Sequence, residues 1–516
     1  MPSAPVRPAV DPVTPGTVPG PDRSHSRAQR FTVVLLIELW ERFGYYGMQA
    51  LLLLFLVERL GFPDSRANLL WGAFAALTYA APAIGGWLGD QVLGSRRAAV
   101  VGACCLMAGY AVLAIPGDAP ELLFLGMGAI STGNGLFKPN AANLVRRIYE
   151  GDDARLDAAF TLYYMAVNIG STASLLLSPA IKDRLGWHAG FGVSALGLLL
   201  GLGAYSVLRG RLSAIGSRPD FAPLPPSRAV AVGVGMVASV LAITFILQHP
   251  AVARACVWIA GLAVLGAWSL VYVRVPGAER PGLLASYLLT LQVMLYFIFY
   301  QQQSTSLTLF TLRNVDPTFR IGGTALFSLS AGQFQALNPI WIMVLSPILA
   351  ALYNALGRSG RDLRMPTKYL VGFCFVSGAF VIWWLFTGAG APAHVTPWAM
   401  VAGYGSISLG ELLISGLSLA MIARYTPQRL SAFMMGGLFV AYGIALYVGS
   451  ILANLAALPP ELRTAPPEQT LPLYHALFGH LLELGLAATV ASLVLLPVLR
   501  GLDRRHRLHV EAAAAS

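Results

Sequence analysis

Fourteen apolar segments follow one another along this chain and account for most of its length. Each approaches or exceeds the roughly 20 residues that an α-helix needs to cross a bilayer. Hydrophobic residues make up 56% of the chain and charged residues only 11%, a balance that excludes an ordinary soluble domain. We therefore expect an all-α polytopic membrane protein with 14 transmembrane helices. The expected helices are 31–60, 66–89, 98–116, 121–145, 157–181, 188–208, 229–248, 252–273, 282–311, 331–356, 366–388, 396–423, 430–456 and 473–499.

The positive charges predict the orientation of these helices. With both termini inside, the inner segments hold 25 of the 35 Lys and Arg residues, the outer loops hold 8, and Arg42 and Lys138 lie within helices. Cytoplasmic loops of membrane proteins carry such an excess of Lys and Arg. We therefore expect both termini in the cytoplasm. The net charge of +11 then needs no nucleic-acid partner.

The ends of the chain differ from its middle. Residues 1–30 are rich in proline, contain four arginines and have no apolar core, so we expect a disordered cytoplasmic tail and not a signal peptide. Residues 500–516 are basic and are expected to form a second cytoplasmic tail. The four cysteines lie within apolar segments without metal-ligand spacing, so they indicate neither a disulfide framework nor a metal site.

One pair of helices interrupts a regular arrangement. Residues 210–280 contain a connection rich in proline and arginine, then two spans whose interiors hold no ionisable residue. These spans resemble an inserted hairpin that faces lipid. Without the hairpin, six helices remain in 31–209 and six in 281–499, which is the layout of a transporter built from two six-helix bundles.

The first apolar segment contains three charges where lipid is expected. Glu38, Glu41, Arg42, Tyr45 and Gln49 lie at helical spacing on one narrow face. A charge near the middle of a bilayer costs about 2.5 to 3.5 kcal/mol on insertion scales, so three of them require partners in a protein interior or a watery cavity. This helix should therefore have one polar face and one lipid face.

Two further charges lie well inside apolar segments. Lys138 shares a helical face with Ser131 and Asn134, and Glu411 lies in a stripe of Tyr and Ser side chains. The alternatives are that Lys138 extends to the inner interface and that Glu411 is a structural group bonded to serines. Uncharged polar residues on other helices extend the lining of the expected cavity: Tyr79, Tyr163, Tyr164, Asn168, 301–306, Gln335 and Asn338.

The charges of this interior suggest both a proton site and a cargo. Three acids face two bases, so one acid is in excess if all ionise, and a desolvated carboxylate tends to take up a proton. A small zwitterion, with one amine and one carboxylate, would match separated acidic and basic poles. Glu411 would form the acidic pole, and Arg42 with Lys138 the basic one.

Several motifs also match known transporters. The run Gly86-Trp-Leu-Gly89-Asp90-Gln-Val-Leu-Gly94-Ser-Arg96-Arg97 resembles the inner-loop motif of the major facilitator superfamily. The alternative interpretation is a glycine turn followed by arginines of an ordinary cytoplasmic loop. More specific matches follow in order along the chain: Glu38-xx-Glu41-Arg42-Phe43-x-Tyr45-Tyr46-Gly47, Gly133-x-Gly135-xx-Lys138-Pro139-Asn140, Phe160-Thr-Leu-Tyr-Tyr-Met-Ala-Val-Asn168-Ile-Gly170, Leu337-Asn338-Pro339, Gly410-Glu411-Leu412 and Met434-Met435-Gly436. Together they resemble the bacterial proton-dependent oligopeptide transporter family, within the major facilitator fold.

The resemblance implies a role for each of these residues. Glu38, Glu41 and Arg42 would couple protons, and Arg42 with Lys138 would receive the carboxylate of a peptide. The amine end would be held by Asn168, Asn338 and Glu411, with Tyr45, Tyr46, Tyr79, Gln302 and Ser415 also in the substrate site. Lys138 and Glu411 would approach each other when the inner gate closes, and Asp90, Arg96 and Arg97 would latch the two halves.

Two departures from the family pattern concern the outer gate. Many members have an arginine where this chain has Gln49, and a glutamate where Gln302 stands, and in the family those two form a salt bridge. Replacing both partners keeps the pair neutral, whereas losing one leaves a charge that costs about 3 to 5 kcal/mol. We therefore expect Gln49 and Gln302 to replace the bridge as a neutral pair. Gly416 and Leu438 also differ from the usual residues, so the pocket should differ in size.

The sequence thus predicts a proton-coupled symporter that imports di- and tripeptides across the bacterial inner membrane by alternating access. The expected coupling ion is the proton, with no other cofactor, and the expected functional unit is a monomer. A relative that carries another small solute, such as an amino acid or a peptide-like drug, remains the main alternative. Two further alternatives have less support. A membrane-embedded enzyme is disfavoured because the eight histidines offer no metal or catalytic spacing, and a passive channel because of the charged stripe on the first helix.

Overall fold

The computed structural model describes residues 25–117, 119–359, 363–392, 394–459, 462 and 465–515. These residues form a helical bundle, which confirms the all-α prediction. The α-helices are α1 (Arg27–Leu54), α2 (Asp64–Leu88), α3 (Ser95–Leu113), α4 (Pro120–Ile148), α5 (Asp153–Leu185), α6 (Trp187–Leu208), α7 (Pro226–Gln248), α8 (Pro250–Arg274), α9 (Arg280–Gln301), α10 (Ser306–Asn314), α11 (Leu337–Arg358), α12 (Met365–Phe386), α13 (Pro397–Ile414), α14 (Ser418–Tyr425), α15 (Gln428–Ala453) and α16 (Pro467–Ala515).

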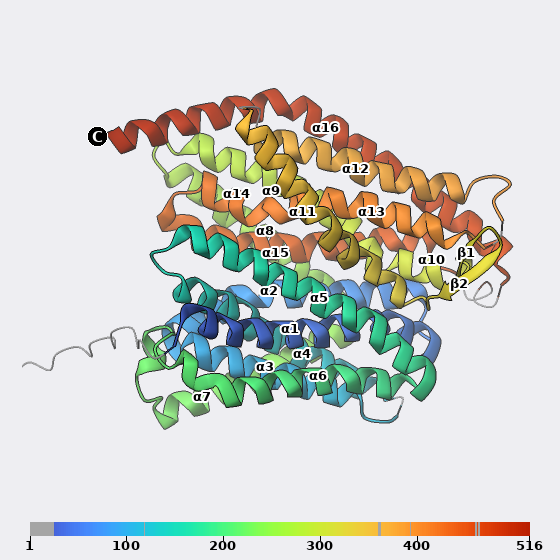
Figure 1. Ribbon diagram of the computed structural model, residues 1–516, viewed down its shortest axis with the longest axis horizontal. Helices are drawn as coiled ribbons and strands as arrows, with labels where there is room; N and C mark the ends of the chain where they lie inside the picture. The colour runs from blue at the N-terminus through green and yellow to red at the C-terminus, as the bar shows by residue number, and fades with distance from the viewer. Residues whose placement is uncertain are drawn as a thin grey trace, which may run out of the picture.

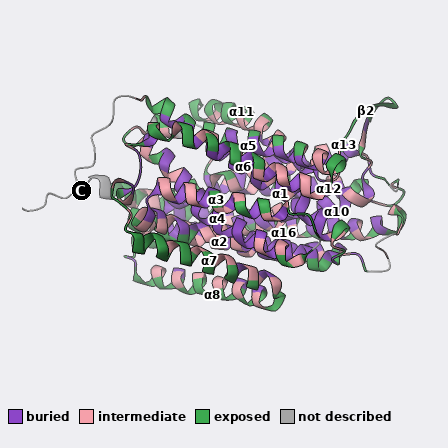
Figure 2. Cartoon of the chain, turned by 90° about the horizontal axis from the view of Figure 1, so that it is seen from below, coloured by how far each residue is buried: buried purple, intermediate pink, exposed green. Residues whose placement is uncertain are grey.

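The helices run nearly parallel and form two halves (Figure 1). In the N-terminal half, α1 packs against α5 and α6, and α3 packs against α4; in the C-terminal half, α12 packs against α13 and α16. The largest contact between the halves joins α2 and α15. The hairpin α7–α8 lies at one edge of the bundle, where many of its residues are exposed (Figure 2). This is the predicted layout of two six-helix bundles with an added hairpin.

Two helices contain breaks that divide one membrane crossing into two. A turn of 3₁₀-helix, Gln302–Ser304, separates α9 from α10, and another, Ser415–Leu417, separates α13 from α14. Each pair counts as one span, so the structure has the predicted 14. Within the described residues, twelve spans are apolar enough to cross a membrane by length and composition alone. The other two, α1 and α4, carry Glu38, Glu41 and Arg42, and Lys138.

Some predicted boundaries were wrong. The first helix begins at Arg27 and not at residue 31, since Ser26 caps it by accepting a hydrogen bond from the Gln29 amide. The last helix continues through most of the predicted tail 500–516, as far as Ala515. A short antiparallel hairpin, β1 (Thr318–Ile321) and β2 (Thr324–Ser328), was not predicted. The predicted disordered tail falls mostly on residues 1–24, which lie outside the described part of the chain.

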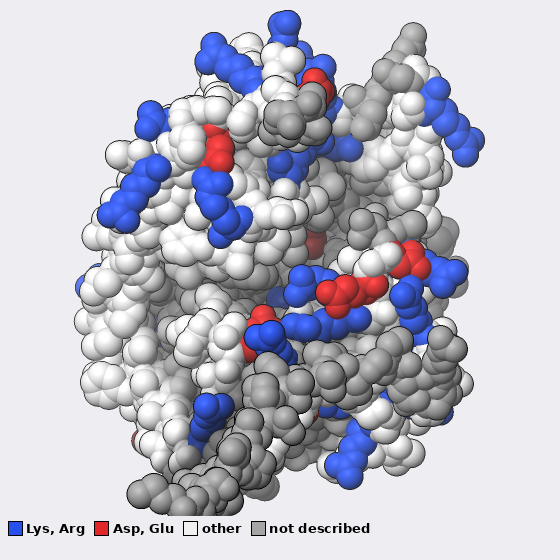
Figure 3. Space-filling model, turned by 90° about the vertical axis from the view of Figure 1, so that its left-hand side faces the viewer, with Lys and Arg blue, Asp and Glu red and all other residues white. Residues whose placement is uncertain are grey.

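The two ends of the bundle differ. We call the end that carries β1 and β2 the β end, and the end where α1 begins and α16 finishes the terminal end (Figure 1). Seen from the terminal end, Lys and Arg side chains gather on the surface, and the surface is hollowed between the halves (Figure 3). The terminal end is therefore basic and recessed.

The motif from Gly86 to Arg97 lies at the terminal end, but its arginines do not join the two halves as predicted. The Arg96 guanidinium donates to the backbone oxygens of Leu212 and Ser213, and Arg97 donates to those of Pro219 and Ala222. These acceptors belong to the connection between α6 and α7. The arginines have this partner because the connection folds back under the N-terminal half.

An acidic residue that the sequence analysis missed holds this connection. Asp220 is 6% exposed and accepts hydrogen bonds from the backbone amides of Arg96 and Ser217. The predicted latch residue Asp90 accepts from the Asn143 amide at 2.9 Å and lies 3.5 Å from Arg147, both on α4. The motif therefore ties α2, α3 and α4 to the segment that leads into the hairpin.

Candidate functional site

The three charges of α1 form one buried cluster. The Arg42 Nε lies 2.5 Å from Glu41 Oε2 and 3.4 Å from Glu38 Oε1. Glu38 is 2% exposed, Glu41 is fully buried and Arg42 is 5% exposed. Glu38 Oε2 and Glu41 Oε1 are buried, and neither has a hydrogen-bond partner among the described residues. Two carboxylates thus share one guanidinium, and each has an oxygen free to accept a proton.

Side chains from α4 and α2 hold this cluster in place. Arg42 Nη2 donates to Asn134 Oδ1 at 3.1 Å, and Asn134 Nδ2 donates to the Thr78 carbonyl at 3.1 Å. One turn along α4, Lys138 Nζ lies 4.9 Å from the centre of the Tyr79 ring. The stripe on α4 predicted from Asn134 and Lys138 therefore faces the stripe on α1, and the two basic groups lie on the same side.

The cluster borders a small cavity between the two halves. The N-terminal half provides Arg42, Tyr45, Tyr46, Gln49, Trp71, Ala75, Thr78, Tyr79, Asn134 and Lys138, and the C-terminal half provides Tyr300, Gln301, Ser304 and Leu446. Its volume is about 20 Å³, enough for about one water molecule. In this conformation the cavity is too small for a peptide, so binding requires the halves to separate further.

An acidic group occupies the C-terminal half. Glu411 Oε2 accepts a hydrogen bond from Asn338 Nδ2 at 2.8 Å, and the same amide nitrogen donates to Ser408 Oγ at 3.0 Å. Glu411 lies on α13 one turn before the helix break, and Asn338 lies at the start of α11. Tyr46 lines the cavity beside Arg42. The basic pole thus belongs to the N-terminal half and the acidic pole to the C-terminal half.

Other predicted site residues lie elsewhere. Gln302 is fully buried, and its amide donates to the carbonyls of Ile298 and Gly449 instead of lining the cavity. Its neighbour Gln301, the last residue of α9, lines the cavity, because successive side chains of a helix point in different directions. Asn168 donates to the Tyr164 carbonyl within α5. The Ser415 carbonyl accepts from Ser418 within the break of the helix.

The predicted neutral pair between Gln49 and Gln302 is wrong. Gln49 Nε2 instead donates to Gln335 Oε1 at 3.2 Å, and Gln335 Nε2 donates to Thr308 Oγ1. Gln49 thus joins α1 to the segment before α11, while Gln302 bonds within the C-terminal half. Gln301 and Ser304 belong to the run 301–306 that was expected in the lining, and both line the cavity. The sequence analysis missed Tyr300 and gave Asn134 no role beyond its place on the face of Lys138.

The β end is closed by an ion pair that the sequence analysis did not predict. Arg313 on α10 donates through both terminal nitrogens to the Asp64 carboxylate at the start of α2, at 2.7 and 2.9 Å. The Asp64 side chain is 1% exposed and that of Arg313 is 13% exposed. The Leu458 amide also donates to Asp64. This bridge and the Gln49–Gln335 contact link the two halves beyond the cavity.

The Arg313→Gln substitution should destabilise this conformation strongly, because it leaves the buried Asp64 carboxylate without its partner. Breaking one side of a buried pair costs about 3 to 5 kcal/mol. The measurement is an unfolding titration of the purified protein. Arg320→Gln is the matched control, since the Arg320 side chain is 55% exposed and lies 3.8 Å from Asp316 at the same end. Equal losses for both variants would contradict a special role for the Asp64–Arg313 pair.

The gate contact expected between Lys138 and Glu411 is not formed in this conformation. The nearest partners of Lys138 are on α1 and α2, and Glu411 accepts a hydrogen bond from Asn338 on α11. The halves are recessed at the terminal end (Figure 3), so the two residues have room to approach when that end closes. Within the described residues, no three His, Cys, Asp or Glu side chains form a group that would hold a metal ion.

The arrangement is suited to binding and release, not to covalent chemistry. The basic pole, Arg42 with Lys138, lines the cavity on the N-terminal half, and the acidic pole, Glu411 with Asn338, belongs to the C-terminal half. One pole also contains carboxylate oxygens able to take up protons. A zwitterionic solute that touches both poles is thereby placed on the interface that must move for the cavity to open.

Comparisons with known families agree with this geometry. The profile described as PTR2: POT family matches residues 96–469. Among curated relatives, dipeptide and tripeptide permease A of Escherichia coli strain K12 is 39% identical, over 94% of this chain and 94% of its own length. Dipeptide and tripeptide permease B of Aliivibrio fischeri strain MJ11 is also 39% identical, over 91% of this chain and 94% of its own.

Solved structures give the same result for the fold. Tetrameric PepTSo2 superposes with a TM-score of 0.84 at 47% identity, covering 92% of this chain and 99% of that one. A variant of the peptide transporter POT in complex with alafosfalin superposes with a TM-score of 0.75 at 28% identity, covering 94% and 97%. The similarity extends over nearly the whole chain, so it includes both halves and the hairpin.

Proposed function

Because this chain belongs to the POT family of transporters, we propose that it is a proton-coupled symporter that takes up di- and tripeptides by alternating access. The observation that carries the proposal is the placement of a buried basic pole on one half of the molecule and of an acidic pole on the other half. Arg42 and Lys138 lie on the N-terminal half, and Glu411 with Asn338 lies on the C-terminal half. The names of the similar permeases and peptide transporters support the same cargo.

In this proposal the poles bind the two ends of a peptide. The carboxylate lies against Arg42 and Lys138, because a guanidinium and an ammonium donate charge-assisted hydrogen bonds to carboxylate oxygens. The amine lies against Glu411, which Asn338 positions. The backbone termini are common to all di- and tripeptides, whereas side chains differ. A site built on the termini would therefore accept many sequences.

The proton is the proposed coupling ion, and the α1 cluster is its site. Arg42 neutralises one of the two carboxylates, and the second is then a buried negative charge unless it takes up a proton. When a peptide carboxylate engages Arg42, the guanidinium is shared among three acids. Binding of the peptide then favours protonation of Glu38 or Glu41, and this couples peptide uptake to proton uptake.

We further propose that both termini lie in the cytoplasm of a bacterial inner membrane. The gathering of Lys and Arg at the terminal end supports this orientation (Figure 3). The structure would then be recessed toward the cytoplasm and closed toward the outside. One chain provides both the basic and the acidic pole, so a single chain is the proposed transport unit, also within any larger assembly.

The direct test is uptake of labelled dialanine by the purified protein in liposomes under an imposed pH gradient. We expect accumulation above the external concentration that stops when the gradient is collapsed. Competition by tripeptides but not by single amino acids would separate peptide transport from the main alternative, transport of an amino acid or another small solute. Uptake that does not depend on the pH gradient would overturn the proposed proton coupling. Equilibration of the peptide across the membrane without accumulation would indicate a passive channel.

Lys138→Ala should weaken transport of peptides with a free carboxylate more than transport of amidated peptides. Removing one partner of a buried charge pair costs about 2 kcal/mol or more, which is about 30-fold in affinity. The measurement compares inhibition constants of dialanine and its amide. Lys182→Ala is the control, since Lys182 pairs with Asp183 at the β end, outside the cavity. Equal losses for the two ligands would remove Lys138 from the carboxylate site.

A further inference from the structure

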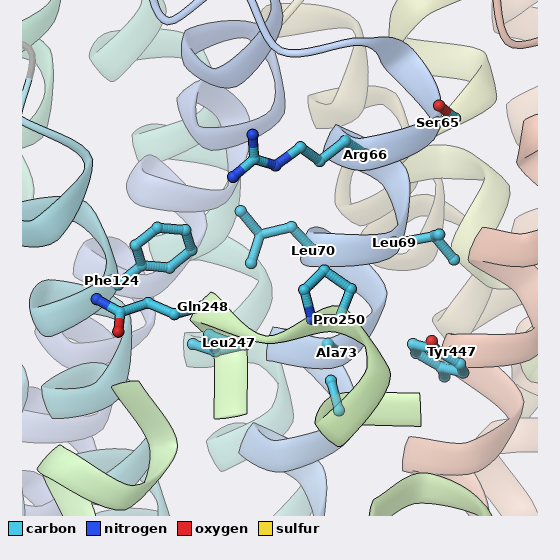
Figure 4. Close-up of a pocket in the computed structure, with 11 residues that line it drawn as sticks. Ser65, Arg66, Leu69, Leu70, Ala73, Phe124, Leu247, Gln248, Pro250 and Tyr447 are labelled. Carbon is cyan, nitrogen blue, oxygen red and sulfur yellow. The ribbon is translucent and has the colours of Figure 1, made fainter. Parts of the chain in front are cut away.

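A second cavity, separate from the central one, lies under the tip of the α7–α8 hairpin. It has a volume of about 230 Å³ and is bordered by the start of α2, the α7–α8 turn and α15 (Figure 4). A narrower cavity of about 60 Å³ continues from it toward the middle of the bundle. Ala73 and Ala253 line both cavities, so the two form one elongated space. We call this space the hairpin groove.

The mouth of the hairpin groove is polar and basic. Arg66 reaches over Leu70, and the Gln248 amide lies across the opening from it (Figure 4). The Arg66 guanidinium lies 4.1 Å from the centre of the Phe62 ring, and among the described residues no acidic side chain forms an ion pair with it. Arg254 follows the lining residue Ala253 near the start of α8 and is exposed. Within the described residues neither arginine forms an ion pair with an acidic side chain, so two cations are available at this end of the groove.

The inner part of the groove is apolar and narrow. Small and aliphatic side chains line it, among them Ala76, Ala80, Val257, Ala260 and Ile444. They come from α2 in the N-terminal half, α8 in the hairpin and α15 in the C-terminal half. An apolar cavity of about 150 Å³ is already large enough to bind benzene. The hairpin groove is longer, and its shape is suited to a flexible hydrocarbon chain.

We propose that the hairpin groove binds one anionic glycerophospholipid. Its phosphate would lie between Arg66 and Arg254, and part of one acyl chain would extend past Ala73 and Ala253. Guanidinium groups bind phosphate oxygens through paired hydrogen bonds. The groove opens among membrane-spanning helices, where such lipids are the surrounding solvent. The bound lipid would contact both halves and the hairpin at once, whatever solute the central cavity carries.

The first test measures lipid binding directly. The purified, delipidated full chain is titrated with phosphatidylglycerol in a neutral detergent, and bound lipid is counted by native mass spectrometry. We expect one tightly retained lipid, and about tenfold weaker retention in the Arg66→Gln/Arg254→Gln double variant. Arg320→Gln removes a cation from β1, at the same end but outside the groove, and should leave retention unchanged. Equal losses in the double variant and this control would overturn the site.

A second pair of variants tests the groove apart from its charges. Ala253→Leu fills the shared section of the cavity, whereas Ala255→Leu adds the same volume to the exposed face of α8. Only Ala253→Leu should release long-chain phosphatidylglycerol. Retention of inorganic phosphate or of a short-chain lipid equal to that of the long-chain lipid would show that the acyl chain is not bound. Because retention needs no transport, failure here is distinct from failure of the proposed uptake.

Discussion

Glu41→Gln should abolish accumulation driven by a pH gradient while leaving peptide exchange across the liposome membrane. Glu41 is fully buried, and one of its oxygens has no partner, so it is suited to take up a proton. A glutamine has nearly the same shape and can still accept the Arg42 hydrogen bond, but it cannot carry a proton through the cycle. With one proton per peptide, a gradient of about one pH unit supports up to about tenfold accumulation. The variant should show none.

The comparison of driven uptake with counterflow exchange makes this prediction specific. Exchange requires binding and movement of the halves, but no net proton transfer, so it also shows that the variant is folded. Glu483→Gln is the control, because its carboxyl side chain is 78% exposed on α16. Normal accumulation by Glu41→Gln would mean that Glu38 or another group carries the proton.

Glu411→Gln should weaken binding of peptides with a free amine by about 30-fold or more. The glutamine oxygen can still accept the hydrogen bond from Asn338, so the local structure is retained while the negative charge is lost. Truncating one partner of a buried charge pair costs about 2 kcal/mol or more. Competition assays with dialanine and with its N-acetylated form provide the measurement, and only the free amine should be affected.

Ser408→Ala provides a control for Glu411→Gln at the same place. It removes the other acceptor of the Asn338 amide but no charge. A neutral hydrogen bond contributes about 1 kcal/mol, so the loss should be about fivefold and equal for both peptides. An acetylated peptide that loses as much affinity as dialanine in Glu411→Gln would show that Glu411 supports the structure of the site instead of binding the amine.

The fold could be predicted from the sequence because the bilayer imposes a length and a composition on every crossing. Charged residues inside apolar segments, such as Glu38 and Lys138, also identified the helix faces that meet in the interior. The breaks at Gln302 and Ser415 were harder to predict, since they depend on a few residues without a strong local signal. Gln301, the last residue of α9, lines the cavity, whereas Gln302 at the first break bonds to backbone carbonyls of the C-terminal half.

The hydrogen-bond and ion-pair partners that join distant helices were the second feature that the sequence did not predict. Asp64 and Arg313 lie in short loops or at helix ends, where charges are common, so neither attracted a functional prediction. Gln49 and Gln302 were paired on the family pattern, but each found another partner once the helices packed. Likewise Arg96 and Arg97 bind a connection whose path no periodicity describes. Helical faces can be read from spacing, whereas pairing across helices depends on how those faces pack.

The α7–α8 hairpin is attached differently on its two sides. On α7, Ser239 hydrogen-bonds Thr132 of α4, and Thr244 donates to a backbone oxygen of the same helix. On α8, Trp268 stacks on Tyr287 of α9 and accepts a hydrogen bond from its hydroxyl. One arm therefore belongs to each half. A rotation of one half against the other would therefore change the angle between the two arms at the turn formed by His249 and Pro250.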